Sequence, residues 1–248
     1  MNRRVLLVIP CFHESGRIKP FLRELKEVFA SDDEVSVLVV DDGSGEEEVS
    51  KMQLIVEAER QGWSGLRPLL SAPHEGKGGA IYTGWVANEG EDWLAFVDAD
   101  GSSSAHEVKR LLAMRGEGAV FASRIKMLGR SIERHWHRHL LGRVFATLVG
   151  ELLKVPVYDS QCGLKLVPRA AFEKVRAGLK LRGFTFDVEL LCALLDSGCR
   201  VTEVPIDWCE VPGGKVKLLR DSFRMARDVL EIRRSRHDKA LDTPRADS

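Results

Sequence analysis

The chain has 248 residues, enough for one α/β domain with a large buried core, and we predict a single domain. Its 37 Lys and Arg residues balance its 37 Asp and Glu residues, so no overall positive charge favours a nucleic-acid partner. Five cysteines form an odd set without a C-x-x-C pair, and we expect reduced thiols of a cytosolic protein. No run of about 18 apolar residues occurs, so we expect any membrane contact to be peripheral.

The first half of the sequence alternates strand patterns with helix patterns. Apolar runs at 5–9 and 35–40 indicate buried parallel strands. Between them, apolar residues recur at helical spacing, at Ile18, Leu22, Leu25, Val28 and Phe29. The alternation continues with helix, strand, helix and strand at about 46–61, 66–71, 79–88 and 93–97. The pattern predicts a Rossmann-like, mostly parallel sheet flanked by helices.

The second half is less regular. Strand-like segments at 119–123 and 162–167 surround a basic stretch and a helix ending near 154, and a further helix is predicted at about 186–197. We place the boundary between the two halves near residue 123, within a domain of residues 1–235. The polar residues 236–248 are expected to form a disordered tail.

Acidic side chains follow three of the predicted strands at the point where each strand ends. They are Glu14 after the first strand, Asp42 after the second, and Asp98 and Asp100 after the fourth. Ligands of such sheets bind at these carboxyl ends. The Asp98-Ala-Asp100 pair suits Mg²⁺ or Mn²⁺, which prefer carboxylate oxygens and leave room for substrate phosphates. The alternative is a turn in which the carboxylates cap backbone amides.

Three motifs precede this D-x-D in order: Pro10-Cys-Phe-His-Glu14, Val40-Asp-Asp-Gly-Ser44 and Gly76-Lys-Gly-Gly-Ala80. Together the four resemble glycosyltransferase family 2, whose members share the GT-A fold. Over residues 3–234 the sequence is similar, more narrowly, to the dolichyl-phosphate glucosyltransferase and mannosyltransferase group. The segments that carry this similarity are Ala122-Ser-Arg124, Asp159-Ser-Gln-Cys-Gly-Leu-Lys165, Phe186-Asp-Val-Glu-Leu-Leu191, Glu203-Val-Pro205 and Trp208-Cys-Glu-Val-Pro-Gly-Gly-Lys215. The last of these is closer to the glucosyl branch.

The resemblance implies an inverting transfer of a hexose from a nucleotide sugar to a polyprenyl or dolichyl phosphate. UDP-glucose is the first expected donor and GDP-mannose the second. The resemblance also implies a donor half, to about residue 123, whose nucleotide pocket is lined by Pro10, Phe12, Glu14, Val40 and Asp42. Metal and sugar diphosphate would be held by Asp98, Ala99 and Asp100. A phosphate acceptor is already ionised at neutral pH, so no strong general base is required.

Some of these positions have a second interpretation. Asp42 is also placed to form a turn or to cap a helix beginning at Glu46. Lys77 is expected either to neutralise the diphosphate, to hold an acid, or to stand in a plain helix-start loop. Ser102 occupies a position where mannosyl relatives often have a Gln as an extra metal ligand. Because serine is a shorter and weaker ligand, water or nothing would complete the metal site.

The acceptor half contains a basic stretch between residues 126 and 143. Its charged members are Lys126, Arg130, Glu133, Arg134, His135, His137, Arg138, His139 and Arg143. Arg124 and Arg138 offer forked donors for an acceptor phosphate, while a solvated basic face is the alternative. Arg124 and Lys215 are the candidates for stabilising charge at the phosphates. Asp187 is expected at the site, and a helix N-cap role is its equal rival.

The C-terminal segment has an apolar stripe of Leu219, Phe223, Ala226 and Leu230 with arginines on either side. Docking of this stripe on the core is preferred over contact with an anionic membrane, and the two are compatible. We expect a peripheral protein on the inner face of the membrane, with a possible membrane-anchoring partner. The alternatives are a glycosyltransferase with a soluble acceptor and a non-catalytic nucleotide-sugar-binding protein.

Overall fold

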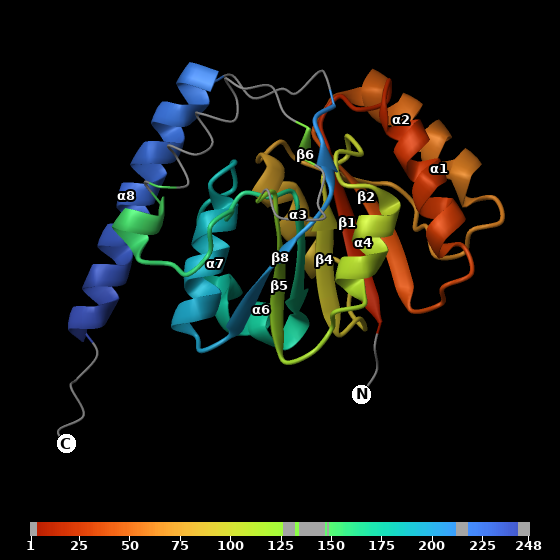
Figure 1. Ribbon diagram of the computed structural model, residues 1–248. Coiled ribbons are helices and arrows are strands. Elements are labelled where there is room, and N and C mark those ends of the chain that lie inside the picture. Colours follow the sequence, from red (N-terminus) through yellow and green to blue (C-terminus); the bar gives the residue numbers. More distant parts are fainter. Residues whose placement is uncertain (1–3, 126–131, 134–146, 148, 212–217, 243–248) are drawn as a thin grey trace.

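A seven-stranded sheet forms the centre of the protein, and helices cover both of its faces (Figure 1). The structure, a computed structural model, describes residues 4–125, 132–133, 147, 149–211 and 218–242. The strands are β1 (Val5–Cys11), β2 (Val35–Asp42), β3 (Leu70–Ala72), β4 (Trp93–Val97), β5 (Gly118–Ser123), β7 (Leu164–Pro168) and β8 (Arg200–Pro205). The helices are α1 (Ile18–Phe29), α2 (Glu46–Arg60), α3 (Lys77–Val86), α4 (Ala105–Leu112), α6 (Arg169–Val175), η1 (Arg176–Gly178), α7 (Phe186–Asp196) and α8 (Leu218–Asp242). Strands β6 (Ile132–Glu133) and β9 (Trp208–Cys209) pair separately.

The strand order β3-β2-β1-β4-β7-β5-β8 confirms the predicted mostly parallel sheet. Strand β7 is antiparallel to both of its neighbours, and the other pairs in this sheet are parallel. The chain builds outward from β1 through β2 to β3 and then returns to place β4 on the other side of β1. This reversal creates a switch point between β1 and β4, where open α/β sheets bind their ligands.

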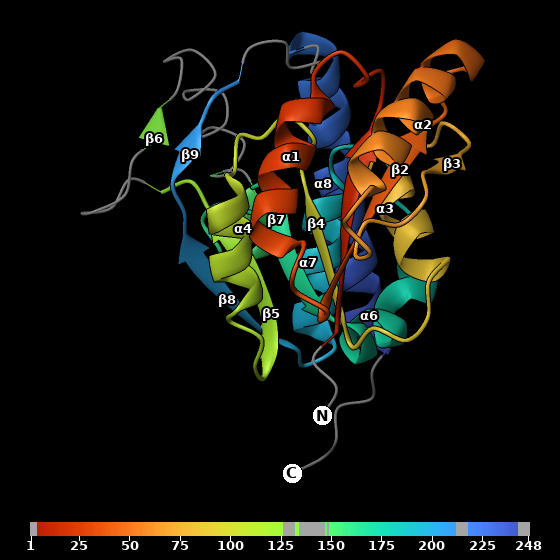
Figure 2. The ribbon, with the colours of Figure 1, turned by 90° about the vertical axis from the view of Figure 1, so that its right-hand side faces the viewer.

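Two apolar layers hold the helices on the sheet. Helices α1, α2 and α4 pack on one face, and α3, α6, α7 and α8 pack on the other (Figures 1 and 2). Strand β1 is covered on both sides, which explains why it is a continuous apolar run rather than an alternating one. Its carboxyl end is thereby fixed at the upper edge of the sheet in Figure 1.

Several elements were not predicted from the sequence, namely α4, α6, η1, β8 and the short strands β6 and β9. The edge strand β8 alternates exposed and partly buried residues, and it lacks the apolar run that marks the central strands. Helix α4 begins after Ser104, whose hydroxyl accepts a hydrogen bond from the Glu107 amide at 3.3 Å. The spacing Ser104 to Glu107 is that of a capping box, a signal that would have placed this helix. The predicted third strand is shorter than expected, with Leu66 forming an isolated bridge to Val37.

The C-terminal helix differs from its prediction in two ways. It continues to Asp242, so residues 236–242 are helical instead of disordered. Arg236 anchors it, because its guanidinium pairs with Asp196 at 2.6 Å and donates to the carbonyl of Leu153 at 2.6 Å. No helix in the described ranges combines the length and the apolar character that a membrane crossing requires.

The face by which α8 docks was also predicted wrongly. Val229 and Ile232 are buried, whereas Phe223 is 80% exposed and Leu230 is 45% exposed. The packed face is thus formed by Val229, Ile232 and Arg236, which recur at helical spacing. Part of the apolar stripe therefore faces solvent.

Candidate active site

Asp98 and Asp100 lie at the carboxyl end of β4, beside the switch point. Gly101 follows with a positive φ of 73°, which allows the chain to turn sharply there. The amide and hydroxyl of Ser102 donate to Oδ1 of Asp100 at 3.0 and 2.7 Å. Ser102 therefore orients the Asp100 carboxylate in this structure. Ala99, between the two acids, is buried in the core.

Lys77 is the cationic partner of Asp98. Its Nζ lies 2.6 Å from Oδ1 of Asp98, so of the three alternatives for Lys77 the structure shows the one in which it holds an acid. Burial opposes the charge of Lys77, but the nearby carboxylates, Asp98 first, outweigh it and raise its pKa. The backbone of Gly163 closes the other side, since a Cβ at this position would lie 2.0 Å from Oδ2 of Asp98.

An aromatic wall stands beside these acids, formed by the loops after β1 and β3. The Phe12 ring stacks on His74 with centroids 4.6 Å apart, and His13 meets the same ring edge-on at 4.5 Å. The amide of His13 donates to the Ser44 hydroxyl at 2.8 Å and ties this wall to the loop after β2. His74 was not predicted, although it stands just before the glycine-rich motif. A planar wall of this kind suits stacking by a nucleotide base.

Asp42 holds the glycine-rich loop. Its Oδ1 accepts hydrogen bonds from the amides of Glu75 and Gly76, at 2.9 and 3.1 Å. The N-cap alternative for Asp42 is wrong, because α2 is preceded by Gly45 and has no side-chain cap. The predicted contact of Asp42 with a nucleotide stays a prediction.

Val40 and Pro10 are paired in the register of β1 and β2, but their surroundings differ. Pro10 is partly exposed at the cleft, whereas Val40 is fully buried under α3. A Cβ at Gly84 of α3 would lie 3.0 Å from Cγ2 of Val40. The Val40 side chain is therefore part of the core, and the predicted contact of Val40 with the nucleotide stays a prediction.

Glu14 is buried and bound to a cation that was not predicted, Arg17. Nη2 of Arg17 donates to Oε1 of Glu14 at 2.8 Å, and a second hydrogen bond joins Nε to Oε2. The hydrogen bond that Arg17 donates to Glu14, together with the charges of Glu14 and Asp100, raises the pKa of Arg17. Arg17 therefore brings positive charge to the Asp100 side of the cleft.

Arg124 forms a two-pronged ion pair with Asp159, in which both nitrogen to oxygen distances are 2.8 Å. Burial alone would raise the pKa of Asp159, but the Arg124 charge lowers it to about 2. The amide of Asp159 in turn donates to Glu203 at 2.8 Å, and the guanidinium lies over the Trp208 ring. The structure thus shows Arg124 gripping a carboxylate, and its phosphate contact stays a prediction. Arg138 and Lys215 lie outside the described residues, as does most of the basic stretch.

Asp187 lies in the first turn of α7, and the residue before this helix is Thr185, so the N-cap alternative for Asp187 is wrong. Its Oδ2 is 3.3 Å from Nζ of Lys165, a lysine with no exposed surface. Burial raises the pKa of Asp187, and the charges of Lys165 and Lys77 oppose that rise. Sequence reasoning did not predict a role for Lys165, although its motif had been singled out.

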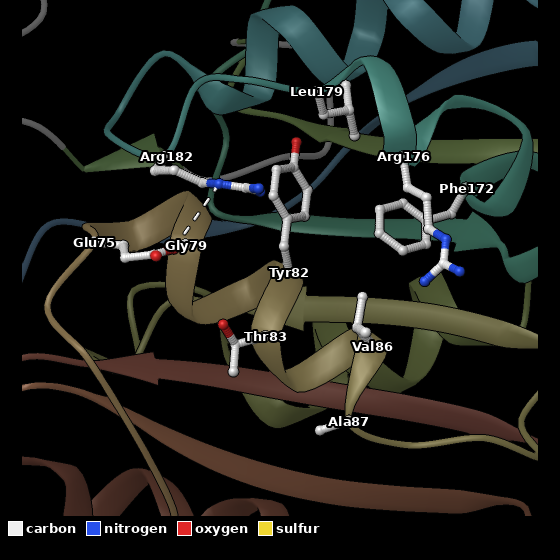
Figure 3. A pocket seen from close by; sticks show the side chains of 10 residues that line it. All are labelled: Glu75, Gly79, Tyr82, Thr83, Val86, Ala87, Phe172, Arg176, Leu179 and Arg182. Carbon is white, nitrogen blue, oxygen red and sulfur yellow. Dashed lines mark ion pairs between the residues drawn. The ribbon is translucent and has the colours of Figure 1, made fainter.

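A groove of about 450 Å³ lies behind the glycine-rich loop (Figure 3). Tyr82 and Phe172 form its apolar floor, and the Arg182 guanidinium lies over the Tyr82 ring at 5.2 Å. The Arg182 carbonyl accepts a hydrogen bond from the Gly79 amide at 3.0 Å, so this loop supports the start of α3 from behind. The lining of the groove does not include Asp98 or Asp100. The groove is therefore separate from the two acids, although its lining includes Gly79 of the glycine-rich loop.

The comparison with known families decides the classification. The family described as Glycosyl transferase family 2 matches residues 6–176, which include Glu14, Asp42, Lys77, Asp98 and Asp100. The chain belongs to glycosyltransferase family 2. The predicted family and the predicted class of enzyme are thereby confirmed.

Relatives of this glycosyltransferase cover nearly all of the chain. A dolichyl-phosphate beta-glucosyltransferase of Saccharomyces cerevisiae is 33% identical over 247 residues, which span 92% of this chain and 73% of the relative. The enzyme of the same name from Mus musculus is 30% identical, over 94% of this chain and 75% of the relative.

Solved structures confirm the GT-A fold of this glycosyltransferase. Glucosyl-3-phosphoglycerate synthase from Mycobacterium tuberculosis, in complex with UDP, superposes with a TM-score of 0.64 at 19% identity. The match covers 94% of this chain and 80% of the synthase. A mannosyltransferase from Pyrobaculum calidifontis, in complex with GDP-mannose and Mn²⁺, superposes with a TM-score of 0.58 at 18% identity. The match covers 98% of this chain and 66% of the mannosyltransferase.

Proposed function

We propose that this glycosyltransferase moves glucose from UDP-glucose to the phosphate of a polyprenyl or dolichyl phosphate, with inversion at the anomeric carbon. The observation that carries the proposal is the 33% identity, over 92% of the chain, with an enzyme named for this reaction. The cleft geometry supports it, because an aromatic wall, two acids and a lysine stand together at the switch point of the sheet.

Asp98 and Asp100 are the residues that would hold Mg²⁺ or Mn²⁺. Among the described residues no group of three or more His, Cys, Asp or Glu gathers as a closed metal site. Two carboxylates fit a cation that completes its coordination with water and substrate phosphates. When bound, such a cation offsets the negative charge that develops on the departing diphosphate. The hydrogen bonds from Ser102 fix one oxygen of Asp100 for this purpose.

The reaction is a single displacement. An oxygen of the acceptor phosphate forms a bond to the anomeric carbon, and the bond between that carbon and the UDP oxygen breaks. Because a phosphate monoester has a second pKa of about 6, the acceptor is already ionised and gives up no proton to a general base. We assign the acceptor phosphate to Arg124 and Arg138, whose forked guanidinium groups match phosphate oxygens, and the diphosphate to Lys215 and Lys77.

The acceptor is a membrane lipid, and the exposed face of α8 is suited to a membrane surface. Phe223 and Leu230 project from it, with the exposed Arg224 and Arg227 between them. Exposed apolar side chains flanked by arginines favour an interface of anionic lipid. We therefore place the enzyme peripherally on the cytoplasmic face of a membrane. The five cysteines are all unpaired, as a reducing compartment requires.

The test is transfer of labelled sugar by the purified protein. UDP-glucose and GDP-mannose are each incubated with a long-chain polyprenyl phosphate in vesicles or with phosphoglycerate, and the products are identified by mass. Glucosyl phosphoryl polyprenol from UDP-glucose supports the proposal, and Asp100→Asn is the inactive control. A mannosyl product would show that the donor is GDP-mannose, and a water-soluble product would show that the acceptor is a soluble molecule. UDP-glucose binding without any product would indicate a binding protein.

A further inference from the structure

Four charged side chains alternate in sign behind the proposed donor site. Lys77 pairs with Asp98 at 2.6 Å, and Lys165 pairs with Asp187 at 3.3 Å. Both lysine ammonium groups lie over the ring of Phe96, at 5.4 and 5.2 Å from its centroid. The two ion pairs are therefore neighbours around one aromatic ring.

The inner pair is fixed. Lys165 has no exposed surface, donates to the Cys162 carbonyl at 2.7 Å, and also lies over the Phe121 ring. Asp187 is 2% exposed, and its Oδ1 has no hydrogen-bond partner within the part of the chain that the structure describes. A buried carboxylate oxygen without a donor is costly. The inner pair thus contains one unused acceptor next to the site.

The outer pair is placed differently. Lys77 retains 18% exposure of its side chain and stands at the first position of α3, directly after Gly76 with its φ of 100°. Its charge acts on Asp187 as well as on Asp98. A long lysine side chain has several rotatable bonds, so its ammonium can change partner while its backbone stays in place.

We propose that Lys77 is an exchangeable counter-ion, which neutralises Asp98 in the donor-free enzyme and moves to the unpaired oxygen of Asp187 when a divalent cation and nucleoside diphosphate occupy Asp98. This inference rests on the proposed donor site. Asp187 is then a positioning residue that acts through Lys77, rather than a group that contacts substrate.

The exchange has a physical reason. Lys77 and a divalent cation compete for the same Asp98 carboxylate, so the ammonium must leave when the cation binds. A second carboxylate, whose charge already acts on Lys77 and whose lysine partner lies over the same Phe96 ring, lets the ammonium leave without becoming an unpaired charge in a mostly buried place. Lys165, whose Nζ lies 3.3 Å from Oδ2 of that carboxylate, favours its ionised form and holds it in place. The positive charge therefore stays next to the diphosphate after the exchange.

The first measurement is the affinity of the purified protein for Mn²⁺ alone, by electron paramagnetic resonance, without nucleotide. Lys77→Met removes the competitor and is expected to tighten Mn²⁺ binding roughly fivefold. Arg182→Met is the matched control. It removes a nearby positive charge that pairs with Glu75, at 3.9 Å, and it is expected to leave Mn²⁺ affinity unchanged. If Mn²⁺ binds equally more tightly to both variants, the loss of any nearby positive charge explains the effect and the exchange of Lys77 is overturned.

The second measurement is a double-mutant cycle. Asp187→Asn leaves Lys77 with Asp98 as its partner, so Mn²⁺ binding is expected to weaken several-fold. In the Lys77→Met background the same substitution is expected to have no effect. An equal loss in both backgrounds would show that Asp187 acts on the cation directly, and would overturn the proposal.

Asp187→Asn leaves the Lys165 charge buried, so its fold is checked by thermal melting. If it does not fold, Lys165→Met/Asp187→Asn replaces it in the cycle, because removing both charges of a buried pair is often tolerated. Wild-type protein that binds neither Mn²⁺ nor UDP with Mn²⁺ would overturn the proposed function itself. If the wild type binds Mn²⁺ but the effects of Lys77→Met and Asp187→Asn on Mn²⁺ affinity add independently, the exchange of Lys77 is overturned and the proposed function is not.

Discussion

The two halves of this glycosyltransferase, which we propose to bind the donor and the acceptor and call the donor half and the acceptor half, present charge in different ways. In the donor half, Asp42 is the last residue of β2, and Asp98 and Asp100 follow β4, so all three stand at the carboxyl ends of strands. In the acceptor half, charges are paired below the surface, as Arg124 with Asp159 and Lys165 with Asp187.

The reason for this difference is topological. Parallel strands deliver their following loops to one edge of the sheet, while the antiparallel β7 carries a mid-strand lysine between β4 and β5. In the proposed site, the edge of the sheet would supply the groups that bind ligands, and the inserted strand would supply the charges behind them.

The largest expected effect is on an acid at the edge. Asp100→Ala is expected to lower the rate of glucose transfer by about 100- to 1,000-fold, because a proposed cation and diphosphate ligand is lost. The melting temperature is expected to stay near that of the wild type, since the residue is in a loop at the cleft. Transfer is measured with labelled UDP-glucose, and a chelator is expected to silence the wild-type enzyme until Mg²⁺ or Mn²⁺ is restored. Full activity of the variant would remove Asp100 from the active site.

The next effect concerns Gly163 of the acceptor half, whose backbone lies against Asp98 of the donor half. Gly163→Ala would place a Cβ 2.0 Å from Oδ2 of Asp98, so the carboxylate must move away from its place beside Lys77. We expect UDP to bind about tenfold more weakly. We expect the free energy of unfolding to fall by less than the free energy of UDP binding does. Gly183→Ala is the matched control, because no atom lies within 4 Å of its added Cβ. Calorimetry with UDP and Mn²⁺ tests both, and unchanged affinity in Gly163→Ala would show that the position of Asp98 is not critical.

The contrast between the halves also explains what the sequence could predict. The donor half follows a simple rule, an apolar run and then acidic residues, so its strands were predicted, with β3 shorter than expected, and its acids do lie at the ends of strands. The roles of these acids in binding stay a prediction. The burial of the Val40 side chain under α3 was not predicted, because a continuous apolar run does not show which face of the sheet each residue points to. His74 and Arg17 were missed because their partners come from other loops or from the helix turn.

In the acceptor half the same reasoning had less to use. Lys165 stands within an apolar strand, where a lysine usually points to solvent, and its burial follows from the position of β7 inside the sheet. For α8, two overlapping faces have apolar residues, and helical spacing alone does not show which one docks. Lys165 stands opposite Phe96 on β4 and Phe121 on β5. These strands are far from β7 in the sequence, so the sequence alone does not show that they pair.

A third effect concerns stability in the acceptor half. Asp159 has a pKa of about 2 in the folded protein against an ordinary value of 3.8, because Arg124 outweighs the effect of burial. Its depressed pKa contributes stability above pH 4, which is lost as the pH falls from about 4 to about 2. Asp159→Asn is expected to cost about 3 kcal/mol at pH 7, since Arg124 loses its partner. Urea unfolding between pH 7 and pH 2 measures this, and a difference from wild type that does not shrink in acid would contradict the assignment.

The smallest expected effect separates the surfaces of the two halves. The purified protein is expected to bind anionic vesicles weakly and in a salt-dependent way, through the exposed face of α8. Phe223→Ser is expected to reduce the partition coefficient by up to about tenfold, because an apolar side chain that enters the interface is lost. Arg227→Gln is expected to reduce it about fivefold at low salt and less at high salt, since the attraction is screened within a Debye length.

Helix α2 provides the control for this surface, because it lies on the opposite face of the sheet (Figures 1 and 2). Leu54 on α2 is 74% exposed, comparable to Phe223, but acidic residues surround the start of its helix. Leu54→Ser is therefore expected to leave vesicle binding unchanged. Cosedimentation with neutral and anionic vesicles at two salt concentrations measures all three variants. Equal losses from Phe223→Ser and Leu54→Ser would mean that binding is unspecific. If the wild type does not bind, transfer to a short-chain soluble prenyl phosphate distinguishes an enzyme that needs an anchoring partner from one with a different acceptor.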